Sequence, residues 1–253
     1  MRLVLVALLL VLTACGQRPG GAPASDPLRG RTFLATAVTD DGGPRDMKLS
    51  IEFTDDGRLI ARASCNMMQG DVDTSGGKLV FDGGLATTDM GCDEERHAED
   101  AFVAEVLGGE PSWQLAGDKL TITSGKTRFE LAPREAVDPD RDLVGTTWEL
   151  DTLIDGQVAS SMPAGTQPVT LVFDGKTVVA DTHCNGVRGD YTIDGDTINV
   201  ELGPMTRMAC ASEIMQGENA VVAVLSGKVS YEVTADRLTL THSSGKGIQL
   251  HAK

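Results

Sequence analysis

The chain carries the segment Thr-Asp-Met-Gly-Cys at residues 88–92 and a second version of it, Thr-Arg-Met-Ala-Cys, at residues 206–210. The two segments lie roughly half the chain length apart, and such self-similarity is the signature of a duplicated unit. If the whole unit is duplicated, the sequence on both sides of these segments should match in the same order.

Further pairs of segments do match in order. They are 28–33 with 143–148, the Phe-ending runs 51–53 and 171–173, Cys65-Asn66 and Gly70 with Cys184-Asn185 and Gly189, and 120–123 with 238–241. We therefore predict two copies of one domain, at residues 28–131 and 143–253. Residues 132–142 contain two prolines and no apolar periodicity, which indicates a linker.

Each copy is mostly strand with a single helix. Residues 48–53 and 170–173 alternate apolar and polar side chains, as half-buried strands do, and Asp-Gly pairs at 56–57, 174–175 and 194–195 indicate hairpins. Helical patterns follow the second cysteine of each copy. One spans about 94–107 with Asp93 as cap and Phe102, Val103, Val106 and Leu107 as its apolar face; the other starts with Ser212 as cap and ends before Gly227. The predicted class is mainly β (β-rich α+β), with two small barrel-like domains that each hold one α-helix.

The amino terminus has the pattern of an export signal. Arg2 precedes an apolar run from Leu3 to Leu12, which is too short to span a bilayer, and the run ends in Thr-Ala-Cys at Cys15. Small residues before a cysteine at this place resemble the lipobox of bacterial lipoproteins. The resemblance implies cleavage of the signal peptide 1–14, acylation of Cys15 and a flexible lipidated tether over 15–27. We expect the protein to be lipid-anchored at a cell membrane, on the extracytoplasmic side.

Four cysteines remain once Cys15 is assigned to the lipid. They allow three connectivities, and pairing within each copy keeps the two repeats equivalent. We expect the disulfides Cys65–Cys92 and Cys184–Cys210, because disulfides persist in exported proteins. The rival is a thiolate metal site, but neither copy has Cys-x-x-Cys spacing, and His183 beside Cys184 has no histidine counterpart at Ser64. We therefore predict no metal and no cofactor.

The ordered set of motifs resembles the META domain family, which includes the HslJ-like envelope lipoproteins. The resemblance rests on an aromatic residue near each domain start, on Cys-Asn followed by Gly, on the Thr-x-Met-[Ala/Gly]-Cys segment before a helix, and on a closing pair of strands. It covers nearly all of 28–131 and 143–250, and the second copy is the closer match. It implies a compact barrel-like fold with a helix and an envelope role linked to stress or drug tolerance, and it supplies no established catalytic residues.

Other candidate residues have structural explanations. Asn66 and Asn185, with Gly70 and Gly189 four residues on, either bind a ligand at the barrel mouth or form a turn in which Gly takes a special conformation; we favour the turn. Met90 and Met208 occupy equivalent positions and are interpreted as core. The four histidines occupy no matching positions in the two copies, which argues against a Cys–His nucleophile.

Composition narrows the function classes. A net charge of −15 disfavours nucleic acid as a partner, and no polybasic segment adds to the lipid as a membrane contact. We predict a monomeric, non-enzymatic protein whose domains act as a binding or stabilising module for an envelope protein partner. The alternatives are a carrier of a small apolar ligand at the barrel mouth and, with less support, a hydrolase.

Overall fold

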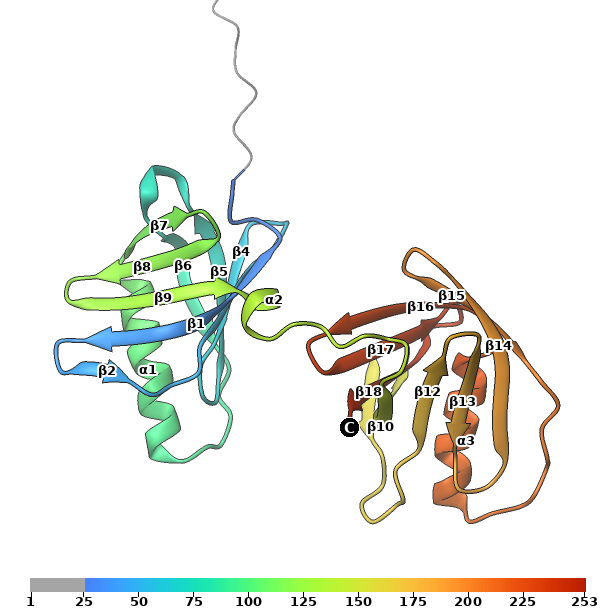
Figure 1. Ribbon diagram of the computed structural model, residues 1–253. Helices are drawn as coiled ribbons and strands as arrows, with labels where there is room; N and C mark the ends of the chain where they lie inside the picture. The colour runs from blue at the N-terminus through green and yellow to red at the C-terminus, as the bar shows by residue number, and fades with distance from the viewer. Residues whose placement is uncertain (1–25) are drawn as a thin grey trace, which may run out of the picture.

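The computed structural model describes residues 26–253, which form two β-rich domains (Figure 1). The predicted signal peptide and lipidation at Cys15 lie outside the described residues, as does most of the tether. Each domain has its own apolar core, and neither core includes a residue of the other domain. The predicted fold class and the two tandem domains are confirmed. Among residues 26–253, no helix has the length and apolar character needed to cross a bilayer.

The first domain is a curled antiparallel sheet. Its strands are β1 (Arg31–Asp40), β2 (Gly43–Arg45), β3 (Ser50–Phe53), β4 (Arg58–Arg62), β5 (Met67–Asp73), β6 (Val80–Thr87), β7 (Ser112–Ala116), β8 (Lys119–Ser124) and β9 (Thr127–Pro133). They follow the order β6-β5-β4-β3-β1-β9-β8-β7, with β2 paired to β1. The short helix η1 (Ser75–Gly77) lies between β5 and β6.

The second domain repeats this order and closes into an eight-stranded barrel. Its strands are β10 (Thr147–Asp155), β11 (Val158–Ser161), β12 (Thr170–Asp174), β13 (Thr177–Asp181), β14 (Gly186–Asp194), β15 (Thr197–Leu202), β16 (Gly227–Thr234), β17 (Arg237–His242) and β18 (Lys246–Ala252). Closure comes from the pairing of β10 with β18, and β11 lies outside the ring on β10.

Closure differs between the copies at one seam. In the second domain β15 and β16 pair over four residues, whereas the equivalent β6 and β7 are not paired as strands, and an isolated bridge joins Lys78, before β6, to Ser112 of β7. Pro111, directly before β7, has no N–H to donate to a ladder, and the pairing of β5 with β6 shifts register opposite Gly83 and Gly84. The first domain is therefore a barrel that is nearly open along one side.

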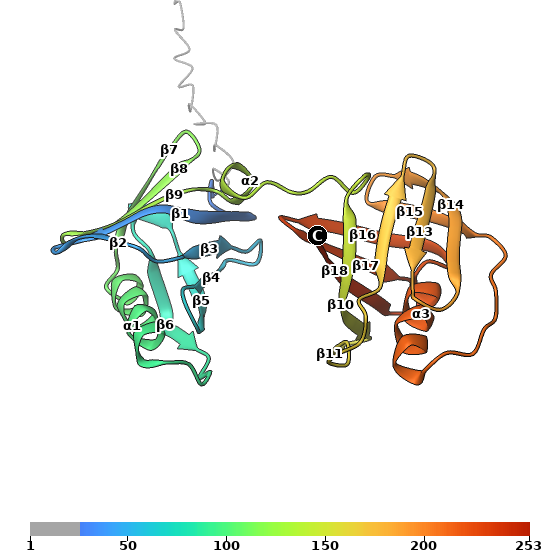
Figure 2. The same ribbon diagram turned by 60° about the horizontal axis from the view of Figure 1, so that its bottom comes forward.

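A single longer helix packs against the curled sheet of each domain (Figures 1 and 2). In the first domain α1 (Glu94–Gly108) buries Val103, Val106 and Leu107, and the Asp93 carboxylate accepts a hydrogen bond from the backbone N–H of Arg96, which confirms the predicted cap. In the second, α3 (Ser212–Val224) buries Val221 and Val224. The predicted Ser212 cap is wrong by one residue: Ala211 holds the cap position and makes no side-chain bond there, so Ser212 is already helical.

The predicted linker is shorter in the structure. Ala132 and Pro133 still pair with β1 as the end of β9, and the four-residue helix α2 (Arg134–Val137) contacts both strands. The C-terminal part of the linker is also fixed by hydrogen bonds: the Asp140 carboxylate accepts from the Arg134 side chain and from the backbone N–H of Ala235. The sequence pattern of 132–142 did not predict that β9 extends to Pro133, because strand pairing does not require an apolar side chain at each position.

The core strands follow the predicted pattern. Ile51 and Phe53 of β3 are buried, as are Leu171 and Phe173 of β12. The three Asp-Gly pairs lie in the tight turns β3–β4, β12–β13 and β14–β15. Both glycines with a counterpart, Gly57 and Gly175, have positive φ, which glycine adopts without steric cost. The hairpins and the alternation of buried side chains are confirmed.

Candidate functional site

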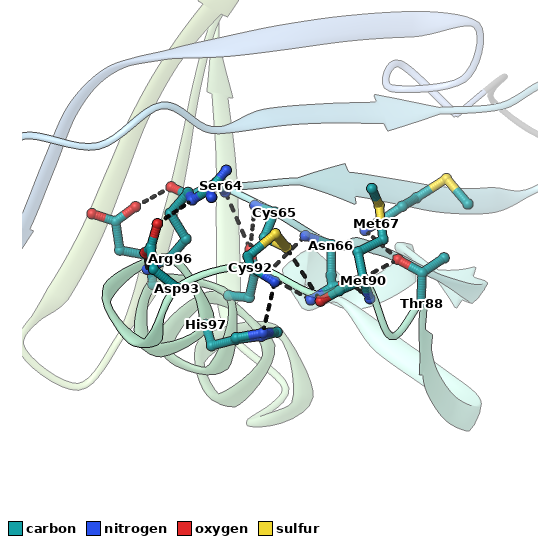
Figure 3. Close-up of a disulfide and its surroundings, with 12 residues drawn as sticks. Ser64, Cys65, Asn66, Met67, Thr88, Met90, Cys92, Asp93, Arg96 and His97 are labelled. Carbon is teal, nitrogen blue, oxygen red and sulfur yellow. Dashed lines mark hydrogen bonds and ion pairs between the residues drawn. A yellow bond between two sulfur atoms is a disulfide. The ribbon is translucent and has the colours of Figure 1, made fainter.

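The two disulfides lie at matching places, where the loop after β4 or β13 meets the segment before the helix. Cys65 is bonded to Cys92 and Cys184 to Cys210, with Cα–Cα distances of 6.4 and 6.1 Å. The predicted connectivity is therefore confirmed. Each disulfide joins two segments that are also connected by hydrogen bonds through the asparagine that follows the first cysteine; Figure 3 shows the first of these places.

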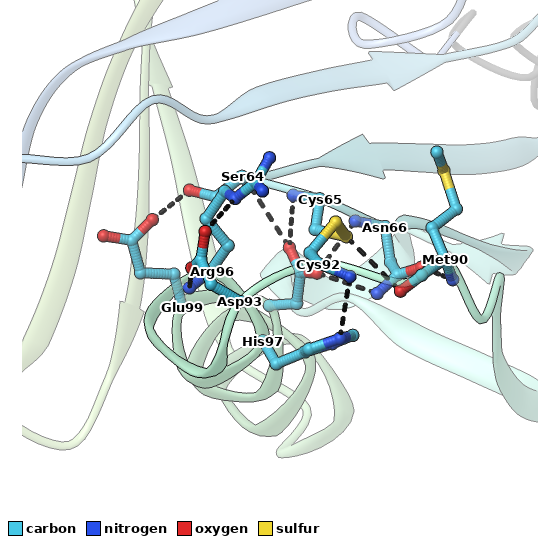
Figure 4. A network of polar contacts seen from close by, with 10 residues as sticks. Ser64, Cys65, Asn66, Met90, Cys92, Asp93, Arg96, His97 and Glu99 are labelled. Atoms are coloured by element: carbon cyan, nitrogen blue, oxygen red, sulfur yellow. Dashed lines mark hydrogen bonds and ion pairs between the residues drawn. A yellow bond between two sulfur atoms is a disulfide. The ribbon is translucent and has the colours of Figure 1, made fainter.

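In the first domain, Asn66 and Asp100 form a buried polar pair. Their exposed fractions are 5% and 4%. The Asp100 carboxylate on α1 accepts hydrogen bonds from the backbone N–H groups of Ser64, Cys65 and Asn66 at 2.8–3.1 Å, and from the Asn66 side-chain amide at 3.0 Å. Next to this pair, Glu99 accepts from the Ser64 hydroxyl (Figure 4). One helical carboxylate thus binds the whole loop that carries the first cysteine.

In the second domain, Asn185 and Glu218 take the same places. The Glu218 carboxylate on α3 accepts from the backbone N–H and side-chain amide of Asn185 and from the Thr182 hydroxyl, each at 2.8 Å. Burial raises the pKa of Glu218, but the hydrogen bonds from Asn185 and Thr182 outweigh it, so that the pKa lies below its ordinary value. The carboxylate is therefore held in its charged form although it is buried.

The carbonyl side of each asparagine binds the segment before the helix. Asn66 Oδ1 accepts from the Thr88 hydroxyl at 3.0 Å and from the backbone N–H of Met90 at 2.8 Å. Asn185 Oδ1 accepts from Thr206 at 2.7 Å and from Met208 N–H at 2.8 Å. These partners are distant in sequence, so the predicted local turn is wrong: each asparagine is a long-range brace between helix, loop and pre-helix segment.

The two glycines serve close strand approach and not a special backbone conformation. Neither Gly70 nor Gly189 has a positive φ. A Cβ at Gly70 would lie 2.6 Å from the carbonyl oxygen of Gly84, and one at Gly189 would lie 2.7 Å from that of Glu201. Glycine is therefore required at both positions, because the backbone of the neighbouring strand approaches too closely for a side chain.

The interpretation of Met90 and Met208 as core is wrong. Their exposed fractions are 56% and 55%. Their backbone N–H groups face the buried asparagines, which turns the side chains toward solvent. Duplicated retention of an apolar residue therefore did not mean burial here.

Histidine His97 was not singled out from the sequence, yet it lies beside the first disulfide (Figure 3). Its Nε2 accepts a hydrogen bond from the Cys92 backbone N–H at 3.3 Å. Met215 follows its own second cysteine by the same number of residues, and its Sδ lies 3.8 Å from Cys184 Sγ. Counting residues from the second cysteine would have matched this pair. His183, by contrast, is exposed and contacts the Pro168 carbonyl oxygen at 3.0 Å.

A groove of about 650 Å³ runs beside α3 in the second domain. The segment 203–209 forms one wall and the helix forms the other. Thioether and apolar side chains line it, and the braced polar pair Asn185 and Glu218 lies at its base; the lining side chains used below are Met205, Met208, Met215, Asn219 and Val222. The predicted ligand-binding residue Asn185 thus borders the groove, although its polar atoms are engaged in the brace.

Solved structures of low similarity were found. A solution structure of a protein from Burkholderia xenovorans is 24% identical with a TM-score of 0.38, covering 44% of this chain and 83% of that one. The Thermotoga maritima DNA polymerase III beta subunit is 12% identical with a TM-score of 0.15, covering 91% of this chain and 58% of that one. Such low scores support no argument about function. No curated protein matches the chain at a significant level.

The family comparison is specific. The model of the META domain matches residues 26–136 and again residues 141–253, which are the two domains of the structure. Such membership suggests a stress-related envelope protein and specifies no chemistry. The chain belongs to the META domain family and carries two of its domains in tandem.

Proposed function

We propose that this protein is a non-enzymatic, lipid-anchored envelope protein whose second META domain binds an apolar segment of an envelope protein partner. The observation that carries the proposal is the methionine-lined groove between α3 and residues 203–209. Thioether side chains are flexible and polarisable, and they are common at surfaces that accommodate varied apolar partners. Met208 at the rim is exposed, as an accessible binding surface requires.

The polar groups at this place support binding over catalysis. Both oxygens of the Glu218 carboxylate accept hydrogen bonds, and the Asn185 side chain both donates and accepts. A general base needs a lone pair within reach of a substrate proton. A carboxylate whose pKa is held low by three internal donors is a poor candidate for that role.

The lipid anchor rests on the sequence alone. The lipobox at Cys15 and the Gly- and Pro-rich tether that follows it support a mature protein whose two domains are connected to the membrane by a flexible lipidated segment. A tethered binding module encounters membrane-associated partners at a raised effective concentration, so that a modest groove is sufficient for engagement.

The second candidate is a carrier of a small apolar ligand. The groove volume favours it, because about 650 Å³ lies within the range of small-molecule sites. The place differs from the predicted barrel mouth: the barrel interior is filled by the side chains of the core, so a ligand would lie outside it, along α3.

A photo-crosslinking amino acid at Asn219, on the groove wall, tests both candidates in cells that express the full chain. A protein partner gives a discrete larger adduct, whereas a small ligand adds only its own mass. Met208→Glu should abolish the adduct, since it places a charge at the groove rim. Ile193→Glu is the matched control, because Ile193 is also an exposed apolar residue of the same domain but does not line the groove.

Two results would contradict the proposal. One is an adduct at Asn219 that is unchanged by Met208→Glu; the other is no adduct of either kind. Turnover of a substrate that is lost on Glu218→Gln but retained in Met208→Glu would show instead that the protein is an enzyme.

A further inference from the structure

A metal-ligating side chain stands next to the disulfide in both domains. His97 occupies the first turns of α1 and Met215 the equivalent place on α3. His97 Nε2 faces the Cys92 backbone, and Met215 Sδ lies 3.8 Å from Cys184 Sγ. The pattern shared by the copies is therefore two cysteines with a third soft or borderline donor, and not the cysteines alone.

In each domain the third donor atom lies close to the sulfur of the first cysteine. In the first domain, ligand atoms of Cys65, His97 and Asp100 are all within 4.8 Å of one another, and Cys92 sulfur is bonded to that of Cys65. All four disulfide cysteines and both third donors are half-buried, so that the sulfurs are shielded yet reachable. While the sulfurs are bonded to each other they are not thiolates and bind metal poorly.

We propose that reduction of each disulfide creates a Cu(I) site, formed by Cys65, Cys92 and His97 in the first domain and by Cys184, Cys210 and Met215 in the second. A dithiol reductant supplies two electrons and two protons: the S–S bond breaks, two thiols form, and the reductant leaves as a disulfide. Cu(I) then displaces the thiol protons and bonds to two thiolates and the third donor.

The choice of metal follows from the second domain. Zinc in proteins takes cysteine, histidine and carboxylate ligands, and a thioether is not among them. Thiolate and thioether together select Cu(I), which also accepts imidazole. Cu(I) is thus the ion that both donor sets fit, whereas Zn²⁺ suits the first set alone.

The surrounding hydrogen bonds keep the sulfurs together after reduction. Asp100 holds the loop of Cys65, and Asn66 holds the segment that leads to Cys92 through the Met90 N–H. Glu218 and Asn185 do the same in the second domain. These four hydrogen bonds involve no sulfur of the disulfide, so they remain after reduction and keep the two cysteines of each pair close together; Asn185 Nδ2 additionally donates to Cys184 Sγ at 3.2 Å.

Anaerobic titration with Cu(I) against the chromophoric chelator bathocuproine disulfonate tests the proposal on the full chain. The oxidised protein should take no Cu(I) from the chelator, and the protein reduced with dithiothreitol and then desalted should take two per chain. His97→Ala and Met215→Ala should each weaken one of the two sites, about tenfold or more. Circular dichroism checks that the reduced chain is folded.

Matched controls separate ligation from general effects. His183→Ala removes a histidine beside Cys184 that faces Pro168, and Met67→Ala removes a thioether close in sequence to Cys65; both should retain two sites. X-ray absorption should show three sulfur donors at copper in the second domain when the first is disabled by Cys65→Ser with Cys92→Ser.

Clear outcomes would overturn the proposal. They are equal Cu(I) uptake by oxidised and reduced protein, uptake unaffected by both His97→Ala and Met215→Ala, or unfolding of the chain on reduction. The proposal would also be contradicted if the reduced chain bound Zn²⁺ at one site and added Cu(I) did not displace it. Cu(I) uptake does not depend on a partner in the groove. The metal-site proposal can therefore be wrong while the proposed binding function is correct.

Discussion

The Asn185 side-chain amide donates to Glu218 Oε1 and its backbone N–H donates to Oε2, both at 2.8 Å. One asparagine therefore binds both oxygens of a buried carboxylate, and its own carbonyl oxygen binds the segment before the helix. The helix, the loop of the first cysteine and the segment of the second are joined through this residue. Asn66 and Asp100 form the equivalent brace with a different division of the oxygens: both Asn66 donors bind Oδ2, and Oδ1 accepts from the backbone N–H groups of Ser64 and Cys65.

Asn185→Ala should destabilise the second domain by about 3 kcal/mol, because it leaves a buried carboxylate with fewer donors. Urea unfolding followed by tryptophan fluorescence measures this. The chain has two tryptophans, Trp113 in the first domain and the fully buried Trp148 in the second, so Trp113→Phe isolates the signal of the second domain. Asn199→Ala, at a half-buried position on β15, is the control; an equal loss there would argue against a special role for the brace.

The brace makes the stability of the second domain dependent on pH. The pKa of Glu218 is lower in the folded domain than in the unfolded chain. Its negative charge therefore stabilises the fold at pH values above 4.5, the ordinary pKa of a glutamate side chain. That stabilisation is lost as the pH falls through the lowered pKa. Unfolding free energies measured from about pH 7 to about pH 3 should therefore decline less steeply in Glu218→Gln than in the wild type. The exposed Glu213→Gln should follow the wild type; parallel curves for all three would refute this assignment.

Gly189→Ala should weaken the pairing of β14 with β15 and lower the unfolding free energy by about 2 kcal/mol, because the new methyl group meets a backbone carbonyl oxygen that cannot move aside cheaply. Gly186→Ala provides the comparison, since Gly186 begins the same strand and a Cβ there meets nothing within 4 Å. If both variants lose equal stability, the cause is a general cost of alanine and not the strand crossing.

The fold was predictable where local pattern decides it. The alternation in β3 and β12, the Asp-Gly turns and the Asp93 cap are properties of neighbouring residues, and the duplication predicted the disulfide pairing. The braces were not predictable in the same way, because Asp100 and Glu218 are single carboxylates among many in an acidic chain. Their partners lie more than thirty residues away, and their identity differs between the copies.

The methionines show a second limit. Met90 and Met208 are apolar, duplicated and near cysteines, which indicated burial, but the hydrogen bond of each backbone N–H to an asparagine decides the direction of the side chain. The groove depends on that direction. The sequence shows which residues are apolar. Which of them face solvent depends on the path of the backbone between Leu202 and Ser212, a segment without regular secondary structure.

Cys15→Ser should abolish lipid attachment, because the lipobox cysteine supplies the sulfur that is acylated. Cells fed an alkyne-bearing palmitate should label the wild-type protein and not the variant, and the wild type should fractionate with membranes. Cys65→Ser with Cys92→Ser controls for loss of a cysteine elsewhere and should label normally. Label retained in Cys15→Ser would refute the anchor while leaving the two domains unaffected.

Removal of the second disulfide separates its contribution from that of the brace. Cys184→Ser with Cys210→Ser opens a loop with a sequence separation of 26 residues, which should cost about 3.5 kcal/mol by the loop-entropy relation. Because the hydrogen bonds of Asn185 and Glu218 remain, the variant should still unfold cooperatively and keep Trp148 buried, as urea titration and quenching of its fluorescence would report. Adding Asn185→Ala should cost more than the sum of the two separate losses, since each connection limits the opening that the other would allow. Simple additivity would mean that brace and disulfide stabilise the domain independently.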